Sequence, residues 1–396
     1  MTGRLDRVVV VGASVAGVTA AETLRRRGFD GSINLVGAEI HLPYDRPPLS
    51  KQVLTGAWDA DRVTFRDPAT LDQLHVDMRL GVRAVGLDTN NRTVELQGGE
   101  RLPYDGLIIA TGLAPRRLSA GHDLAGVHVL RTIEDALALR RALRPGRRLV
   151  VIGAGFLGCE VAAVACEAGL QVCVVDPSPT PMLQQLGQDI GQRAATLHRE
   201  RGVDIRCGAR VLRLIGNGTV TGVELETGDV LDADVVLVAI GSTPETDWLA
   251  NSGLTIDNGV LCDATCRAAP GVYAAGDVAR WWQRTLGTYV RVEHRMNATE
   301  QAIAAASNLL GADIPFTPIP YFWTDQYDVK IQAYGSFPSE ARLIITQGDP
   351  SHGKFIAHYV DKERISGVLS WNMPREIRAE RQLIGTPVLN PNTAVS

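Results

Sequence analysis

The chain has 396 residues, and its 40 Lys and Arg against 44 Asp and Glu give a formal net charge of −4 at pH 7. This balance excludes a strongly basic nucleic-acid binder. Hydrophobic residues make up 45% and charged residues 21% of the chain, which excludes disorder as the main state, and the length favours two or three domains. There is no apolar run of about 18 residues to cross a membrane. Six scattered cysteines without a C-x-x-C pair favour free thiols in a cytoplasmic protein.

The first motif is a predicted strand that turns into a helix. Val8 to Val11 are four valines in a row, as in a parallel strand buried on both faces. Gly12, Ser14 and Gly17 follow at the spacing of the dinucleotide fingerprint G-x-G-x-x-G, with a serine where the middle glycine usually stands. A predicted helix over Val18 to Arg27 comes next.

An acidic residue lies where this kind of motif needs one. After a second predicted strand, Ile33 to Val36, Glu39 lies 22 residues beyond Gly17. An acid at that distance accepts hydrogen bonds from the ribose of a bound dinucleotide. The alternative is a glycine-rich turn without a ligand.

The motif occurs a second time without a substitution. A predicted strand, Arg148 to Ile152, leads into G-A-G-F-L-G and a helix that runs to Ala168, and a further strand over Val172 to Val175 ends at Asp176. The candidate nucleotide-binding residues here are Gly153, Gly155, Phe156, Leu157, Gly158 and Asp176. Two such units predict two dinucleotides, while a decayed duplicate is the alternative.

Three short signals point to the same ligands. A predicted strand over Leu107 to Ala110 leads into the string Ala110-Thr111-Gly112, and Gly241 comes after another predicted strand over Val235 to Val238. The segment Gly271 to Asp277 places a carboxylate on a tight turn, where it would bind the polyol chain of a flavin. Each of these segments is also compatible with an ordinary turn at the end of a strand.

The order of these motifs resembles that of flavoproteins with two dinucleotide-binding domains. Four strings narrow the resemblance to the ferredoxin, rubredoxin and putidaredoxin reductases that serve oxygenases. These strings are YDRPPLSK (44–51), LRTIEDA (130–136), RVEHRMNATEQ (291–301) and PYFWTDQYDVKIQ (320–332). The resemblance covers Val8 to Ile384.

The resemblance implies an α/β fold with two Rossmann-like domains of the glutathione-reductase type and a C-terminal α+β domain with an antiparallel sheet. We expect a discontinuous FAD-binding domain over 1–114 and 242–317, an NAD-binding domain over 115–241 and a C-terminal domain over 318–396. In the last domain we expect strands over 327–334, 343–346, 355–360 and 367–370 and a helix over Arg375 to Ile384.

The family's positions carry over residue by residue. The resemblance implies FAD contacts at the backbone of Ala16 and Ala84, at the side chains of Arg46, Lys51, Arg131 and Asp277, and at the pyrimidine edge through Arg295. Many relatives have tryptophan at the position of Arg295. Asn297 and Glu300 resemble a capping box that starts a helix ending at Leu310, whose dipole would stabilise negative charge on the reduced flavin.

Lys51 and Glu160 resemble the family's pair beside the isoalloxazine, with Lys51 near N5 and Glu160 near the nicotinamide amide. Residue type alone is also compatible with a solvated lysine and a glutamate that only favours the helix dipole. Related disulfide reductases and peroxidases have a redox cysteine near Leu49 to Lys51, and this chain has none there. We therefore expect delivery of flavin electrons directly to an external acceptor.

The sequence thus predicts an FAD-dependent NADH:ferredoxin reductase, with FAD and NADH as cofactors, an iron–sulfur ferredoxin as acceptor and no metal of its own. We expect no nucleic-acid or membrane partner, and a monomer or weak homodimer. NADH is expected over NADPH, because Asp176 would repel a 2′-phosphate. Two alternatives stay open: an NADH oxidase or another flavoprotein that reduces small molecules, and a redox-sensing flavoprotein of the apoptosis-inducing-factor type.

Overall fold

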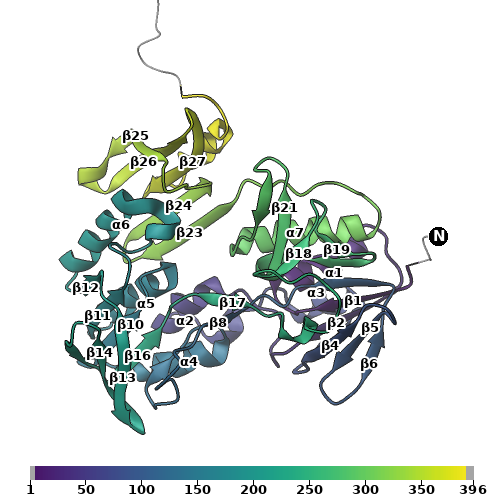
Figure 1. Cartoon of the computed structure of the whole chain (residues 1–396), viewed down its shortest axis with the longest axis horizontal. Helices are drawn as coiled ribbons and strands as arrows, with labels where there is room; N and C mark the ends of the chain where they lie inside the picture. Colours follow the sequence, from purple (N-terminus) through teal and green to yellow (C-terminus); the bar gives the residue numbers. More distant parts are fainter. Residues whose placement is uncertain (1–4, 389–396) are drawn as a thin grey trace, which may run out of the picture. The chain divides into compact units, whose positions relative to one another are not determined.

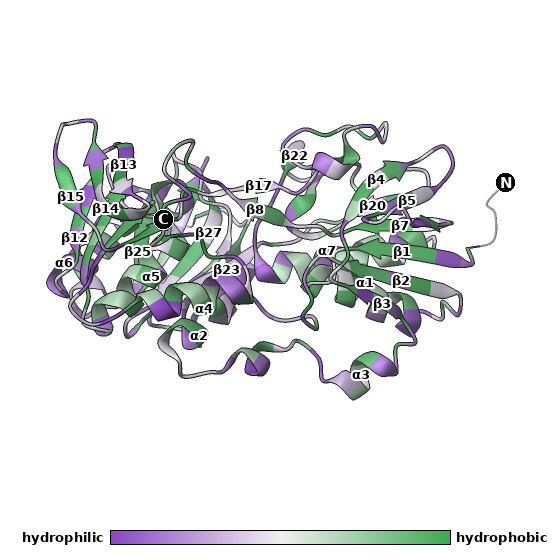
Figure 2. Ribbon diagram, turned by 90° about the horizontal axis from the view of Figure 1, so that it is seen from below, coloured by the Kyte–Doolittle hydropathy of each residue, from purple (hydrophilic) through white to green (hydrophobic). Residues whose placement is uncertain are grey.

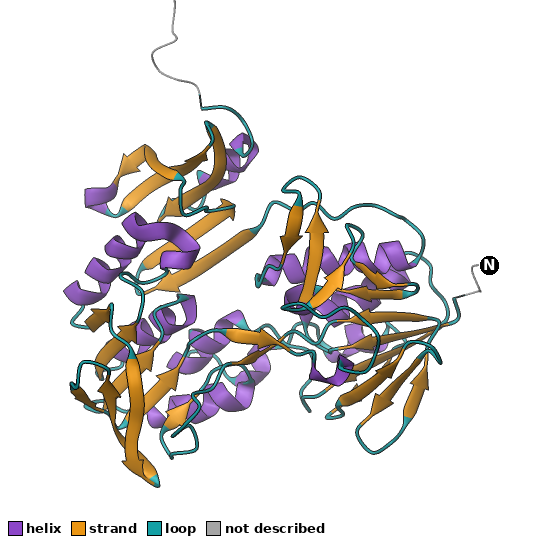
Figure 3. Cartoon of the chain, viewed as in Figure 1, coloured by secondary structure: helices purple, strands orange, loops and turns teal. Residues whose placement is uncertain are grey.

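The computed structural model describes residues 5–388, which form two compact units. The first unit comprises residues 5–46, 60–114 and 242–320, and the second comprises 47–59, 115–241 and 321–388. Both combine sheets with helices (Figure 3). Each unit is therefore built from three segments that are separate in the sequence.

A six-stranded sheet forms the core of the first unit (Figure 1). Its order is β19-β20-β7-β1-β2-β3, and all neighbours are parallel except the pair β19 and β20. The strands are β1 (Arg7–Val11), β2 (Ser32–Gly37), β3 (Asp77–Leu80), β7 (Gly106–Ile109), β19 (Arg267–Ala269) and β20 (Val272–Ala274). The four valines of β1 are buried, and the central strands are hydrophobic along most of their length (Figure 2). The expected buried parallel strand is confirmed, and β20, which precedes Asp277, pairs with β7 in the same sheet.

Two helices of this unit pack against each other beside the sheet, α1 (Val15–Arg26) and α7 (Arg295–Leu309). Buried alanines on α7 allow the close approach, among them Ala302, Ala305 and Ala306. Helix α1 begins at Val15, three residues earlier than expected, because Gly17 lies inside its first turn rather than in the loop.

Smaller elements surround this core. One three-stranded sheet contains β4 (Ala84–Asp88), β5 (Thr93–Leu96) and β6 (Arg101–Pro103), and another contains β18 (Val260–Cys262), β21 (Ala279–Gln283) and β22 (Thr288–Val290). Strands β8 (Leu113–Pro115) and β17 (Ser242–Pro244) pair with each other, and α3 (Pro68–Asp72) is a short helix.

The second unit repeats the parallel arrangement with the strand order β12-β11-β10-β16-β9. The strands are β9 (Val127–His128), β10 (Arg148–Ile152), β11 (Gln171–Asp176), β12 (Asp204–Cys207) and β16 (Val235–Val238). Helices α4 (Ile133–Ala142), α5 (Phe156–Glu167) and α6 (Leu183–Glu200) belong to this unit, as does a three-stranded sheet of β13 (Val211–Asn217), β14 (Thr219–Leu225) and β15 (Val230–Asp232).

The segment Pro47–Asp59 also belongs to the second unit, although it follows the first βαβ motif in the chain. It forms a 3-10 turn over Pro47–Ser50 and the short helix α2 (Gln52–Thr55), which packs against α4. This segment carries Ser50 and Lys51.

An antiparallel sheet with the order β23-β24-β27-β26-β25 completes the second unit. It contains β23 (Tyr321–Gln326), β24 (Val329–Gly335), β25 (Arg342–Asp349), β26 (Lys354–Asp361) and β27 (Arg364–Trp371). The four expected strands are present, and β23 was not expected. The helix expected over Arg375 to Ile384 is wrong in extent: α8 covers only Ile377–Glu380, and a 3-10 turn over Arg381–Leu383 follows. The chain then turns extended, so that the Gly385 N–H donates to the Ile365 carbonyl.

Candidate active site

The first glycine-rich loop packs so tightly that two of its positions accept no side chain. Gly12 has φ +114°, and a Cβ there would lie 2.1 Å from the Ala110 carbonyl oxygen. A Cβ on Gly17 would lie 1.8 Å from the Gly12 carbonyl oxygen. The loop, the first turn of α1 and the end of β7 are thus locked together, as a backbone that approaches a pyrophosphate requires.

Ser14 precedes α1 as its N-cap residue, with extended backbone and no capping hydrogen bond from its side chain. The serine is therefore compatible with the loop. Ala16 is buried, and a Cβ on Gly276 would lie 3.2 Å from its Cβ. The turn that carries Asp277, Gly276–Val278, thus lies beside the start of α1.

The Ala110–Gly112 segment is held by hydrogen bonds to Glu245, the residue that follows β17. Thr111 Oγ1 donates to the Glu245 carbonyl at 2.8 Å, and the Glu245 N–H donates to the Gly112 carbonyl. Ala84, the first residue of β4, is partly exposed and pairs with Leu96.

Glu39 lies just beyond the end of β2 within a polar cluster. Its carboxylate accepts hydrogen bonds from the Tyr44 hydroxyl and from Arg46 Nη2, the latter at 2.6 Å. Burial opposes the charge of Arg46, but the attraction of Tyr44, Glu39 and Asp277 outweighs this effect and raises the pKa of the guanidinium. Glu39, Arg46 and Asp277 therefore share one electrostatic environment in the first unit.

The start of α7 differs from the expected capping box. The helix begins at Arg295 with His294 as its N-cap residue, so Asn297 lies in the first turn and the box is wrong. Asn297 is 2% exposed, and its amide nitrogen donates to the Val292 carbonyl and to Gln301 Oε1, so its side chain does not accept a backbone N–H as a capping residue would. Arg295 donates to Asp45 at 2.7 Å, and its guanidinium lies over the Phe65 ring.

Two buried polar atoms on α7 indicate that this unit fits a ligand. Gln301 Oε1 accepts from the Gly276 N–H at 2.9 Å, which holds the Asp277 turn. Gln301 Nε2 and Asn297 Oδ1 are buried without a hydrogen-bond partner among the described residues. Buried polar atoms are normally satisfied. Together with the glycine loop and Glu39, they fit FAD, which would be held by residues of the first unit.

The second glycine-rich loop has the same internal packing. A Cβ on Gly153 would lie 2.2 Å from the Ala239 carbonyl oxygen, and one on Gly158 would lie 2.0 Å from the Gly153 carbonyl oxygen. Gly155 differs, because its φ is −73° and a Cβ would meet nothing closer than 4.0 Å. Neither packing nor backbone conformation demands glycine there, so the space beside it fits the approach of a nucleotide.

The remaining candidates for the second nucleotide are Phe156, Leu157, Asp176 and Gly241. Phe156 and Leu157 open α5, whose first-turn N–H groups have no acceptors within the helix. The Asp176 carboxylate accepts from the Ala154 and Ser178 N–H groups, both at 2.7 Å. Gly241 is exposed, with φ +91°. Arg131, which the resemblance assigns to FAD, lies in the second unit next to Thr132, the N-cap residue of α4, and its backbone N–H donates to Asp135.

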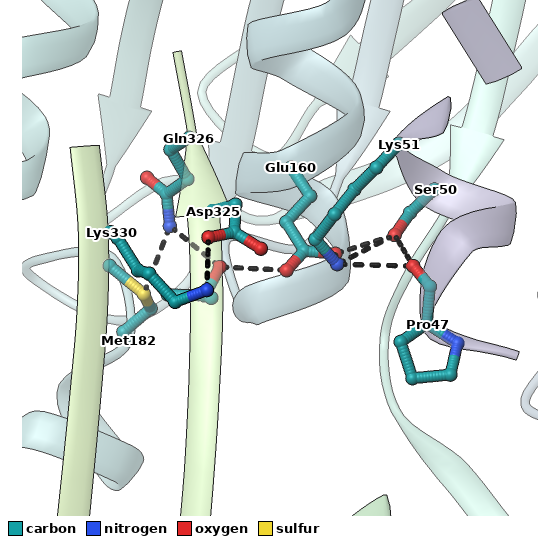
Figure 4. Close-up of polar contacts among 9 residues, drawn as sticks. Pro47, Ser50, Lys51, Glu160, Met182, Asp325, Gln326 and Lys330 are labelled. Carbon is teal, nitrogen blue, oxygen red and sulfur yellow. Dashed lines mark hydrogen bonds and ion pairs between the residues drawn. The ribbon is translucent and has the colours of Figure 1, made fainter. Parts of the chain in front are cut away.

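Lys51 and Glu160 meet in the second unit (Figure 4). Lys51 Nζ lies 2.8 Å from Glu160 Oε2, and the two side chains are 13% and 7% exposed. Glu160 lies in the second turn of α5, so it is near the nucleotide loop but not at the helix end, where a carboxylate would favour the helix dipole. A buried ion pair this close to a nucleotide-binding helix is a candidate for catalysis.

Two hydroxyls that the sequence did not single out complete the environment of Glu160. Ser50 Oγ donates to Glu160 Oε2 at 2.5 Å, and Thr324 Oγ1 donates to Oε1 at 2.8 Å. Both residues lie inside strings that carried the resemblance. Their small polar side chains next to Lys51 and in β23 were the available signal.

Metal-binding groups, disulfides and membrane spans are the other features to consider among the described residues. Within residues 5–388, no group of His, Cys, Asp and Glu is arranged to hold a metal ion. The six cysteines in this part of the chain are free, and three of them are buried. No described helix is both long and apolar enough for a membrane span.

Comparison with known proteins identifies the family. Residues 6–304 match the family described as "Pyridine nucleotide-disulphide oxidoreductase", and residues 321–394 match "Reductase C-terminal". The chain belongs to the pyridine nucleotide-disulphide oxidoreductase family. Family membership implies FAD and NAD(H) as cofactors, and the fold class expected from the motifs is confirmed.

Similar members of the family are reductases. The ferredoxin–NAD(+) reductase component of the anthranilate 1,2-dioxygenase system from Burkholderia cepacia is 40% identical, over 96% of this chain and 94% of that protein. Putidaredoxin reductase from Pseudomonas putida is 34% identical, over 96% and 92%. The crystal structure of a covalent putidaredoxin reductase–putidaredoxin complex matches with a TM-score of 0.92 and 34% identity, over 98% of this chain and 95% of that chain. The resemblance to oxygenase-linked ferredoxin reductases is thereby confirmed.

Proposed function

We propose that this protein is an NADH:ferredoxin reductase that supplies electrons to an oxygenase. The observation that carries the proposal is the buried Lys51–Glu160 pair, which lies one helical turn from the nucleotide loop at Gly155. Relatives that align over 96–97% of this chain are named as ferredoxin–NAD(+) reductase components of dioxygenase systems, which supports the proposal.

We assign FAD and NADH to different parts of the chain. FAD would be held by 1–114 and 242–317 and NADH by 115–241, with 318–396 as a C-terminal domain. In the first part we assign Gly12, Gly17, Glu39, Arg46, Thr111, Gly112 and Asp277 to FAD, supported by the locked loop and the polar cluster around Glu39. In the second, Gly153, Gly155, Gly158 and Asp176 are assigned to NADH.

The bound FAD would supply the redox chemistry, since it accepts a hydride and releases electrons singly to a one-electron carrier. The protein's own residues would position the reacting groups and polarise them. The Lys51 ammonium has acceptors for its three protons at Glu160 Oε2, the Pro47 carbonyl and Ser50 Oγ. It is therefore held as a fixed positive charge, of the kind that stabilises developing negative charge.

No cysteine lies in the segment that holds Lys51. The side chain that precedes Lys51 on that segment is the hydroxyl of Ser50, which does not relay electrons. This supports an external acceptor, and we propose an iron–sulfur ferredoxin.

The setting of the protein is also a proposal. Free cysteines are typical of a reducing compartment, which supports the cytoplasm. We propose a monomer or weak homodimer that acts without nucleic acid.

NADH-dependent reduction of cytochrome c, with and without a two-iron ferredoxin, tests the function. We expect turnover to depend on ferredoxin. Rapid peroxide formation that ferredoxin does not change would instead indicate an oxidase, and a long-lived reduced flavin–nicotinamide complex with nucleotide-driven dimerisation would indicate a redox sensor.

A further inference from the structure

The Glu160 carboxylate ends a chain of hydrogen bonds that runs through the second unit. Thr324 Oγ1 lies 2.8 Å from Glu160 Oε1, and Gln326 Nε2 lies 3.3 Å from Thr324 Oγ1. His198 Nε2 lies 3.0 Å from Gln326 Oε1, and His198 Nδ1 lies 3.0 Å from the Tyr327 hydroxyl. Three elements, α5, β23 and α6, are linked in this way.

The middle members of this series of hydrogen bonds, Thr324, Gln326 and His198, are closed to solvent. Thr324 and His198 are 0% exposed, and Gln326 is 1% exposed. Water therefore does not substitute for any of these contacts, and each polar atom depends on its protein neighbours. Figure 4 shows Gln326 and Glu160 with the polar contacts between them.

The donors and acceptors available on these side chains fix which group donates in each hydrogen bond of the series. Gln326 Nε2 also faces Met182 Sδ at 3.6 Å, and a thioether only accepts, which orients the amide. Its carbonyl then accepts from His198 Nε2–H. Burial lowers the pKa of His198 to about 4, so the ring is neutral at pH 7 and its Nδ1 accepts from the Tyr327 hydroxyl.

These directions determine which hydrogen bonds the Thr324 hydroxyl accepts and donates. Its oxygen accepts the Gln326 N–H, and its only proton is left for Glu160 Oε1. The other carboxylate oxygen, Oε2, receives Ser50 and Lys51. Both oxygens of Glu160 are therefore fixed, one by β23 and one by the segment that carries Lys51.

We propose that Thr324 is a positioning residue for the NADH-dependent reduction step, because it fixes the carboxylate that orients Lys51. This inference rests on the proposed function. It assigns a role in that step to the C-terminal sheet, because Thr324 acts on the step through Glu160.

Two variants at Thr324 separate positioning from packing. Thr324→Val keeps the shape and removes the hydroxyl, and Thr324→Ser restores it. In anaerobic stopped-flow mixing of holoprotein with NADH, we expect Thr324→Val to slow flavin bleaching about tenfold, the scale of a lost hydrogen bond to a charged group. Thr324→Ser is expected to recover to within about twofold. Reoxidation by ferricyanide should be unchanged in both.

A second route tests the same claim without altering Thr324. In Gln326→Glu, the new carboxylate accepts the Thr324 proton and draws it away from Glu160, so bleaching should slow again. Thr346→Val is the matched control, since this exposed threonine of the same sheet donates to the Ile356 carbonyl, far from the chain described above. It should bleach at the wild-type rate.

A double mutant decides whether Thr324 acts through Glu160. In the Glu160→Gln background, Thr324→Val should add little further loss, because the group it positions is already gone. Wild-type bleaching in both Thr324→Val and Gln326→Glu, or a full additional loss in the double mutant, would overturn the inference alone. If NADH does not bleach the wild type, the proposed function fails, and this inference with it.

Discussion

Lys51 and Glu160 form an ion pair at 2.8 Å, and their side chains are 13% and 7% exposed. Removal of one partner from a buried pair leaves an uncompensated charge, which costs about 3–5 kcal/mol. The effects of variants at this pair therefore have to be separated into stability and chemistry.

Lys51→Met should keep bound FAD and slow flavin bleaching by NADH about a hundredfold, because a fixed positive charge is lost. Glu160→Ala should slow the same step and weaken NADH binding. The double mutant should fall short of the summed losses, since the two groups act as a unit. Stopped-flow absorbance measures the step, and thermal unfolding of each holoprotein reports stability separately. Wild-type bleaching in Lys51→Met would return this lysine to a structural role.

The first glycine loop predicts opposite outcomes at two neighbouring positions. Gly12→Ala should yield protein without FAD, because a Cβ at this positive φ meets the Ala110 carbonyl oxygen at 2.1 Å. Ser14→Gly should retain FAD, because the Ser14 side chain makes no capping bond. The ratio of flavin to protein absorbance after purification measures both. Equal flavin content in the two variants would contradict this description of the loop.

NADH should be preferred over NADPH. The Asp176 carboxylate is held beside the second glycine loop by the Ala154 and Ser178 N–H groups, where it would accept the 2′-hydroxyl and repel a 2′-phosphate. The segment after Asp176, from Pro177 to Thr180, has no Arg or Lys to neutralise that phosphate. The ratio of kcat/KM for the two nucleotides measures the preference, and parity would remove the argument.

His198 should make the protein less stable as the pH falls. Its folded-state pKa is about 4, below the unfolded value of 6.5, because burial disfavours the charged ring. The unfolded state therefore binds the proton first, so stability is complete above about pH 6.5 and is lost towards pH 4. Carboxylates titrate in the same range, so the comparison is with His198→Gln. The melting temperature of the wild type should fall more steeply than that of the variant across this window. Parallel curves would show that His198 does not contribute.

The two glycine loops could be predicted from the sequence because their constraints are local. Gly12, Gly17, Gly153 and Gly158 each avoid a backbone clash within a few residues or with the next strand of the same sheet. Their spacing is therefore sufficient evidence. The acids Glu39 and Asp176 follow at the ends of strands for the same reason.

Other features depend on contacts between distant residues. Strand β23 was missed because its buried positions include Thr324 and Gln326, which hide the alternation of apolar and polar residues. The contacts of Ser50 and Thr324 with Glu160 span more than a hundred residues and leave no local pattern. The capping box at Asn297 was wrong because an Asn followed by a Glu at the right spacing also occurs inside a helix, where Asn297 binds a preceding carbonyl.

We expect electrons to pass from NADH through FAD to a ferredoxin. A single-turnover experiment measures this transfer: anaerobic holoprotein is reduced with one equivalent of NADH and then mixed with an oxidised two-iron ferredoxin. Because a hydride carries two electrons and the acceptor takes one at a time, we predict about two equivalents of reduced ferredoxin for each flavin reoxidised. Flavin that stays reduced in the presence of ferredoxin, and is reoxidised only when dioxygen is admitted, would show that ferredoxin is not the acceptor.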